Sequence, residues 1–329
     1  MWVKFCMSVC SLIAVLAVAT TAGAATGAGN GSSASDSSEP VRISFSDSMF
    51  RDVNENDAGA AAKVWAQSLG RDKNVRVDPV VQVLRGTNAI GEAIRTGAVD
   101  VITMTTEEYW HLRHRVSCDT FLYGVKSGSI SEQYVLLVHR DSGIQKVADL
   151  RGRTLTLFRN PRACLAPVWV ETLLGGPGSS RLSGFFGRVT EVNKLSRAVL
   201  PVFFRQADAC LATRAGFETA AELNPQVGQQ LKVLAISPEL VPVVCCFRAD
   251  YHSRCRDQVL AAALHVKSSP AGQQFLTLFQ CDDFAQGTES DLNSALELLA
   301  TYARLTDDSK TAHEPGESVS PGNIQEKAL

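Results

Sequence analysis

The stretch that decides the fold runs from Ile130 to Leu157 and reads ISEQYVLLVHRDSGIQKVADLRGRTLTL. The apolar, β-rich run Tyr134–His139 predicts one strand, and Thr154–Phe158 predicts a second. Between them lie a polar turn, residues 140–143, and a short helical turn that ends at Leu150. The middle of the chain is therefore expected to hold two strands joined by a short connection.

Strands and helices alternate on both sides of this stretch. Helix 87–96 is expected to have Thr87 as its N-cap and Gly97 just after its end, and another helix is expected to begin at Thr105 or Thr106. This alternation predicts an α/β fold with mostly parallel sheets covered by helices. The expected strands are 41–46, 75–84, 99–104, a short strand within 185–192, 209–213, 231–236 and 241–247, and the expected helices are 58–69, 87–96, 163–174, 196–205, 217–224, 254–268, 271–279 and 291–305.

Composition limits the classes of function. The 329 residues are 45% hydrophobic and 20% charged, which is enough for one large or two medium lobes with sizeable cores. The formal net charge is −2 and no long basic run occurs, so nucleic acid is not an expected partner.

Both ends of the chain differ from its body. A single lysine, an apolar run and an Ala-Gly-Ala site predict a signal peptide, residues 1–24, and hence a periplasmic or secreted protein. A membrane anchor is the alternative interpretation of that run, and a lipoprotein is a minor one. Residues 25–40 are small and polar and predict a flexible leader, and residues 306–329 predict a disordered tail.

Seven cysteines remain once the predicted signal peptide is removed. Cys255 and Cys281 flank one predicted helix and are the best candidates for a disulfide, while most of the others are expected to be small buried side chains. No histidine clusters with cysteine at metal-ligand spacing, and no motif of a hydrolase, metalloprotease or nucleotide-binding loop occurs. The sequence therefore predicts no catalytic residues, no metal and no cofactor.

Four motifs, in order and spacing, resemble the phosphate/phosphite/phosphonate-type substrate-binding proteins of bacterial ABC importers. They cover nearly the whole body of the chain. The motifs are VLRGTNAIGEAIRTGAVDVITMTTEEY (residues 83–109), YVLLVHRDSGIQKVADLRGRTL (134–155), AVLPVFFRQADACLAT (198–213) and LKVLAISPELVPVVCCFR (231–248).

The resemblance implies a bilobed type 2 periplasmic-binding-protein fold, with two mixed sheets flanked by helices and two hinge crossings. The crossings are expected at residues 138–141 and 243–247. Lobe one then comprises residues 41–138 and 244–305, and lobe two comprises 141–243. The implied protein is a monomer that closes on a small anionic ligand, such as a phosphate or phosphonate, and delivers it to an ABC permease. The alternative is a clamp that senses a ligand or docks a partner such as a sensor kinase.

The expected ligand site combines loop positions from both lobes. Most members of the family follow the strand after the crossover with a Ser-Thr-Ser-Gly type turn, whereas this chain has FRNPRAC at residues 158–164. Arginines would then bind an anion where the family uses hydroxyl groups. Plain turn residues, N-caps, packing residues and solvated arginines are the alternative interpretations. The candidates are Ser46, Ser48, Thr105, Thr106, Tyr109, Arg159, Asn160, Arg162 and Asp208.

Overall fold

The computed structural model describes residues 39–50, 59–60, 63–64, 67, 77–78, 80–175 and 182–311. The predicted signal peptide, the leader up to residue 38, most of predicted helix 58–69 and residues 312–329 lie outside these ranges. The described residues belong to one compact unit. Within that part of the chain, no helix combines the length and the apolar character that a membrane span requires.

The first lobe is built on a mixed sheet with strand order β11-β4-β10-β3-β1-β2 in the described residues. β1 runs parallel to β2 and β3, whereas β10 is antiparallel to β3 and β4, and β11 is antiparallel to β4. The strand bounds are β1 Ile43–Ser46, β2 Gln82–Leu84, β3 Val101–Thr105, β4 Cys118–Val125, β10 Val243–Arg248 and β11 Asp283–Gly287.

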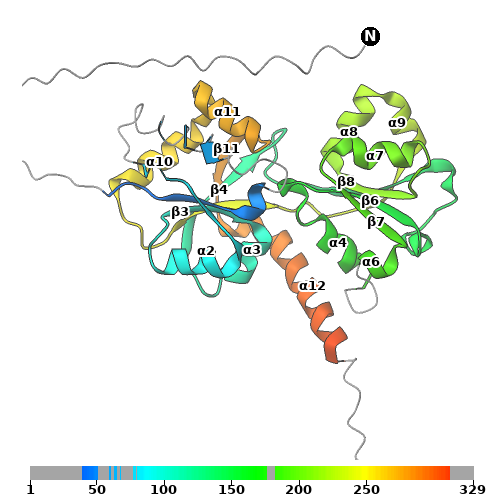
Figure 1. Cartoon of the computed structure of the whole chain (residues 1–329), viewed down its shortest axis with the longest axis horizontal. Coiled ribbons are helices and arrows are strands. Elements are labelled where there is room, and N and C mark those ends of the chain that lie inside the picture. The colour runs from blue at the N-terminus through cyan, green and yellow to red at the C-terminus, as the bar shows by residue number, and fades with distance from the viewer. Residues whose placement is uncertain are drawn as a thin grey trace, which may run out of the picture. The chain divides into compact units, whose positions relative to one another are not determined.

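Helices lie on both faces of this sheet (Figure 1). On one side are α2 (Gly86–Arg95) and α3 (Thr106–Leu112), and on the other are α10 (Arg254–Leu264) and α11 (Pro270–Leu278). The expected start of α3 is confirmed, with Thr105 as its N-cap. The expected cap of α2 is wrong, because that helix begins one residue earlier and its N-cap is Arg85. Short 3-10 turns include η1 (Asp47–Phe50), η5 (Val266–Ser268) and η6 (Glu289–Leu292).

The second lobe has a mixed sheet with order β7-β6-β8-β5-β9. β6 runs parallel to β7 and β8, and β5 is antiparallel to β8 and β9. In Figure 1, α4 and α6 lie on one side of this sheet, and α7, α8 and α9 lie on the other. The bounds are β5 Tyr134–His139, η2 Arg140–Ser142, η3 Val147–Leu150, β6 Thr154–Phe158, η4 Pro161–Ala163, α4 Ala166–Leu173, α6 Leu182–Phe185, β7 Arg188–Val192, α7 Leu195–Phe203, β8 Ala209–Thr213, α8 Arg214–Leu223, α9 Pro225–Gln230 and β9 Leu231–Ile236.

Two segments, residues 126–133 and 237–242, connect the sheets. They hydrogen-bond to each other, because the Glu132 amide donates to the Leu240 carbonyl oxygen at 2.8 Å and the Leu240 amide donates back at 2.9 Å. The predicted crossing at 138–141 is therefore wrong. β5, which was assigned to lobe one, pairs with β8 and β9 of the second sheet. The second crossing likewise lies before β10, and not within it.

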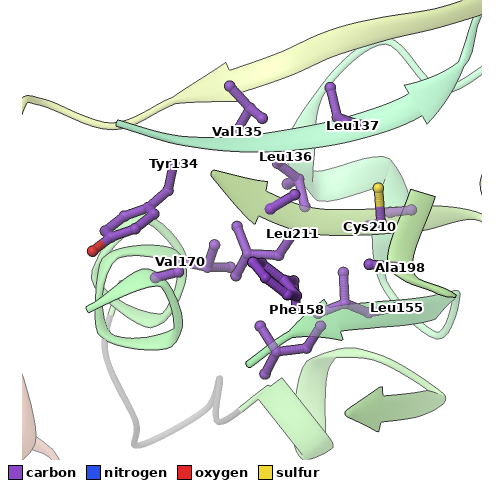
Figure 2. Close-up of a cluster of buried hydrophobic side chains, with 14 of the residues drawn as sticks. Tyr134, Val135, Leu136, Leu137, Leu155, Phe158, Val170, Ala198, Cys210 and Leu211 are labelled. Carbon is purple, nitrogen blue, oxygen red and sulfur yellow. The ribbon is translucent and has the colours of Figure 1, made fainter. Parts of the chain in front are cut away.

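The core of the second lobe explains why β5 belongs there. Tyr134, Val135, Leu136, Leu137 and Val138 are fully buried, so both faces of β5 are covered by apolar side chains. Figure 2 shows this strand above Leu211 and Cys210 of β8, with Leu155 and Phe158 of β6 beside them. A strand buried on both faces has a continuous apolar sequence, as β5 does.

No disulfide links the cysteines of the described residues. The predicted Cys255–Cys281 disulfide is therefore wrong. Both side chains are buried in the apolar cluster between the first sheet and α10 and α11. Burial raises the pKa of the Cys281 thiol to about 11. Its Sγ faces Gly124 of β4, so it packs as a small apolar group.

The last described helix, α12 (Asn293–Thr311), contacts both lobes. Leu296 packs against the core of the first lobe, whereas Ala295 and Leu299 are part of the core of the second. The Tyr302 hydroxyl donates to Glu171 Oε2 of α4 at 2.6 Å. The predicted start of a disordered tail at residue 306 is wrong, since the helix continues to Thr311.

We expect Leu299→Ala to lower the free energy of unfolding by about 2–5 kcal/mol, because it leaves a cavity where a 3% exposed side chain packs. Arg304→Ala, on the exposed side of the same helix, should change it by less than about 0.5 kcal/mol. Urea denaturation measures both. Equal effects of the two substitutions would contradict the packing of α12 against the second lobe.

Candidate functional site

A polar cavity of about 350 Å³ lies between the two lobes. It is at the carboxyl ends of β1, β3 and β6, where open α/β sheets place their ligands. One wall comes from the first lobe and the other from the loop after β6. The lining residues are Asp47, Ser48, Gly86, Thr87, Thr105, Glu107, Glu108 and His111 from the first lobe, and Arg159, Asn160, Pro161 and Cys164 from the second.

The first-lobe wall is organised around the carboxylate of Glu108, which is only 8% exposed. Glu108 Oε1 accepts hydrogen bonds from the hydroxyls of Ser46, at 2.5 Å, and Ser48, at 2.8 Å. Glu108 Oε2 accepts from the Thr105 amide at 2.9 Å and the Thr105 hydroxyl at 3.0 Å. In return, the Thr105 hydroxyl accepts from the Glu108 amide, which completes a capping box at the start of α3.

The second-lobe wall is the turn over residues 159–164. The Arg159 side chain is partly exposed and its Nη2 donates to Glu191 Oε1 at 2.7 Å. Asn160 Oδ1 accepts from the Ala163 amide and caps η4, while its Nδ2 donates to Gln280 Oε1 at 3.2 Å. Gln280 follows α11, so this hydrogen bond joins the lobes. Asn160 also lines a second cavity, of about 510 Å³, whose other lining residues include Thr213 and Lys126.

Arg162 is not part of the 350 Å³ cavity and lies instead against the first crossing. Its Nε donates to Glu132 Oε1 in a buried ion pair, and its Nη1 donates to the Gly124 carbonyl oxygen at 3.1 Å. Nη2 is buried and has no hydrogen-bond partner among the described residues. Arg162 lines the 510 Å³ cavity together with Glu132. A side chain from lobe two is thus fixed to the crossing segment and to β4 of lobe one.

Three other predicted site residues have structural contacts outside the 350 Å³ cavity. Thr106 ties the start of α3 to the second crossing, since its Oγ1 donates to the Val241 carbonyl oxygen at 2.6 Å. The Tyr109 hydroxyl donates to Glu289 Oε1 at 2.7 Å, and burial, followed by this carboxylate, raises the tyrosine pKa above its ordinary value. Asp208 Oδ2 accepts from the amide and hydroxyl of Thr154, both at 2.8 Å.

Asp208 therefore lies at the wrong end of the sheet for this cavity. Thr154 begins β6, whereas the cavity is reached after Phe158, which is about 13 Å further along the strand. Four predicted residues line the cavity: Ser48, Thr105, Arg159 and Asn160. Ser46 lies behind its wall and donates to Glu108. Among the described residues, no cluster of His, Cys, Asp and Glu side chains could hold a metal ion.

Residues 52–292 match the family described as "ABC transporter, phosphonate, periplasmic substrate-binding protein". The chain belongs to this family. No curated protein matches the sequence. The family consists of solute-binding proteins of transport systems, which bind a small molecule in the periplasm and dock with an ABC permease. Membership agrees with the bilobed fold and with the resemblance seen in the sequence.

Solved structures similar to this substrate-binding protein support the fold. One is a binding protein component of an ABC phosphonate transporter from Pseudomonas aeruginosa, at 16% identity and a TM-score of 0.55, covering 85% of this chain and 92% of that chain. A Xanthomonas citri protein bound to ATP has 17% identity and a TM-score of 0.57, with 82% and 99% covered. PhnD1 from Prochlorococcus marinus, in complex with methylphosphonate, has 14% identity and a TM-score of 0.54, with 80% and 98% covered.

Glu108, the central side chain of the first-lobe wall, is not among the site residues predicted from the sequence of this substrate-binding protein. Glu108 follows Thr105 by three residues, and this Thr-x-x-Glu spacing is the sequence signal of a capping box. That signal could have identified the cap. It could not have shown that Ser46 and Ser48, about 60 residues earlier, donate to the same carboxylate.

We expect Arg162→Ala to destabilise the protein by about 3–5 kcal/mol, because it leaves the carboxylate of Glu132, which is 7% exposed, without its partner. Arg159→Ala removes an arginine three residues away that pairs with the exposed Glu191, and should cost less than about 1 kcal/mol. Denaturant unfolding compares the two variants. A larger loss for Arg159→Ala would contradict the structural role given to Arg162.

Proposed function

We propose that this chain binds a small polar ligand in the 350 Å³ cavity between its lobes and delivers it to an ABC permease. The observation that carries the proposal is the cavity itself. It lies at the carboxyl ends of strands from both sheets, and polar side chains from both lobes line it. A ligand that contacts both walls binds the closed arrangement of the lobes more tightly than the open one, and so stabilises the closed arrangement.

The two walls differ in chemistry. The guanidinium of Arg159 lies on the second-lobe wall, whereas Asp47, Glu107 and Glu108 place three carboxylates on the first-lobe wall. We therefore assign the anionic group of the ligand to the Arg159 side and a donor-bearing group to the carboxylate side. Phosphoryl chemistry for the anion is supported by the family and by PhnD1, which is in complex with methylphosphonate.

The hinge of this clamp is assigned to the two crossing segments, residues 126–133 and 237–242. They are the backbone connections between the sheets in the described residues and they pair with each other through Glu132 and Leu240. Residues before 126 and from β10 to β11 then form lobe one, and β5 to β9 form lobe two. The predicted signal peptide supports a periplasmic location.

A ligand at one hundred times its dissociation constant should stabilise the protein by about 2.7 kcal/mol, because it binds only the folded state. Thermal denaturation with methylphosphonate, inorganic phosphate and an aminoalkylphosphonate measures the effect. Arg159→Ala should then weaken binding of the stabilising compound at least about tenfold. Asp208→Asn, at the other end of β6, should leave the affinity unchanged.

Two outcomes would contradict the proposal. One is a stabilising ligand whose affinity is lost with Asp208→Asn and kept with Arg159→Ala. The other is an unchanged radius of gyration on saturation, since a clamp that closes around a ligand becomes more compact. X-ray scattering of the apo and saturated protein gives that comparison.

A clamp that senses a ligand and docks a signalling partner is the second candidate. The observation that favours it is the hydrogen bonding of the Ser46 and Ser48 hydroxyls to Glu108, which leaves them engaged within the protein instead of with a phosphoryl ligand. Permease and ATPase reconstituted in vesicles distinguish the two. Stimulation of ATP hydrolysis by the loaded protein supports transport, and its absence with a bound ligand supports sensing.

A further inference from the structure

The first-lobe wall contains a set of hydrogen-bond donors that converge on one point. These donors are the hydroxyls of Ser46, Ser48 and Thr105 and the backbone amide of Thr105, at 2.5–3.0 Å from the carboxylate oxygens of Glu108. Three hydroxyls and an amide aimed at a pair of oxygens form an oxyanion site. Its occupant in this chain is a side chain.

Glu108 suits this position for both geometric and chemical reasons. A carboxylate presents two acceptor oxygens with about four lone-pair positions, and all four donor contacts here end on those oxygens. Because Glu108 is in the first turn of α3, it is held next to the donors at all times. A tethered group has a high effective concentration, so a free oxyanion competes with it at a disadvantage.

Another backbone donor of the same wall is also hydrogen-bonded to a side chain of the protein. The backbone amide of Gly86, at the start of α2, donates to Asp47 Oδ1 at 3.4 Å, and Asp47 lines the cavity as well. Glu107 adds a third carboxylate to the lining. A phosphate or phosphonate dianion that approached this wall would meet like charge and donors that are already used.

We infer that Glu108 is a specificity-determining residue that replaces the oxyanion of a ligand in the first lobe. It closes this half of the cavity to phosphate and phosphonate groups, so the acceptors left for a ligand are the carboxylates of Asp47 and Glu107, which select a first-lobe end with an ammonium or hydroxyl donor. The inference rests on the proposed function, because it concerns the same cavity. It differs from a plain capping role for Glu108, which would stabilise α3 and leave ligand choice unaffected.

Glu108→Ala and Glu107→Ala form a matched pair of variants of the full mature chain. Each removes one carboxylate from the same wall, but only Glu108→Ala frees the hydroxyls of Ser46 and Ser48. In isothermal titration with methylphosphonate and with inorganic phosphate, we expect Glu108→Ala to bind at least about tenfold more tightly than wild type. Glu107→Ala lowers the negative charge of the wall but frees no donor, so its affinity for both anions should rise by less than about threefold.

Two additional variants test the mechanism. Adding Ser46→Ala and Ser48→Ala to Glu108→Ala should remove most of the gain, because two of the three hydroxyl donors are then absent. If Glu108→Ala does not fold, as circular dichroism would show, Glu108→Gln retains the side-chain volume and an acceptor for the cap. It removes the charge and supplies an amide donor, so it should also bind phosphate more tightly than wild type.

The outcomes separate this inference from the proposed function. Equal methylphosphonate affinity for wild type, Glu108→Ala and Glu108→Gln would overturn the inference, and so would an equal gain for Glu107→Ala. Wild-type protein that binds an aminoalkylphosphonate or an amine but not methylphosphonate supports both. Wild-type protein and variants that bind none of these compounds would overturn the proposed function itself.

Discussion

The arrangement of the cleft depends on the buried ion pair between Arg162 and Glu132. Glu132 belongs to the first crossing, Arg162 to the loop after β6, and the same guanidinium reaches the Gly124 carbonyl oxygen on β4. Two desolvated charges held in this way anchor the second-lobe turn at the first crossing, because loss of one partner would leave the other charge buried and unpaired. Thr106 makes the corresponding contact at the second crossing through the Val241 carbonyl oxygen.

Sequence patterns predicted the architecture well where elements are long and periodic. They predicted less well which sheet a strand joins, because that depends on the strands with which it pairs. The alternation of strands and helices predicted an α/β fold with mostly parallel sheets, whereas both sheets are mixed, as the family resemblance implied. The first crossing was placed one strand too late because β4 was not recognised. Its sequence, CDTFLYGV, has no regular alternation, and β11, DFAQG, has few apolar residues. Only hydrogen bonding to neighbouring strands shows that β5 starts the second sheet.

Only part of the candidate site was predicted, because the sequence indicates where strands end but not which side chains meet there. Ser48, Thr105 and Asn160 follow the carboxyl ends of their strands, and strand direction brings such residues to one edge of an open sheet. Asp208 comes before β8 and so lies at the opposite edge. Tyr109 is three residues beyond the Thr106 start of α3, which turns it toward Glu289 and Phe121. Local spacing gives a residue's place along an element, whereas its contacts depend on the partners that the sheets bring together.

Glu108 shows how one side chain can couple fold stability to ligand choice. Its carboxylate and the Thr105 hydroxyl cap α3, and the same carboxylate accepts from the hydroxyls of Ser48, on the wall of the cavity, and Ser46, behind it. Any change that frees these hydroxyls for a ligand also removes part of the cap, at a cost of about 0.5–2 kcal/mol. A chain that binds an oxyanion in this lobe therefore needs another N-cap for α3. In this chain the wall instead presents acceptors, and a ligand must bring the donors.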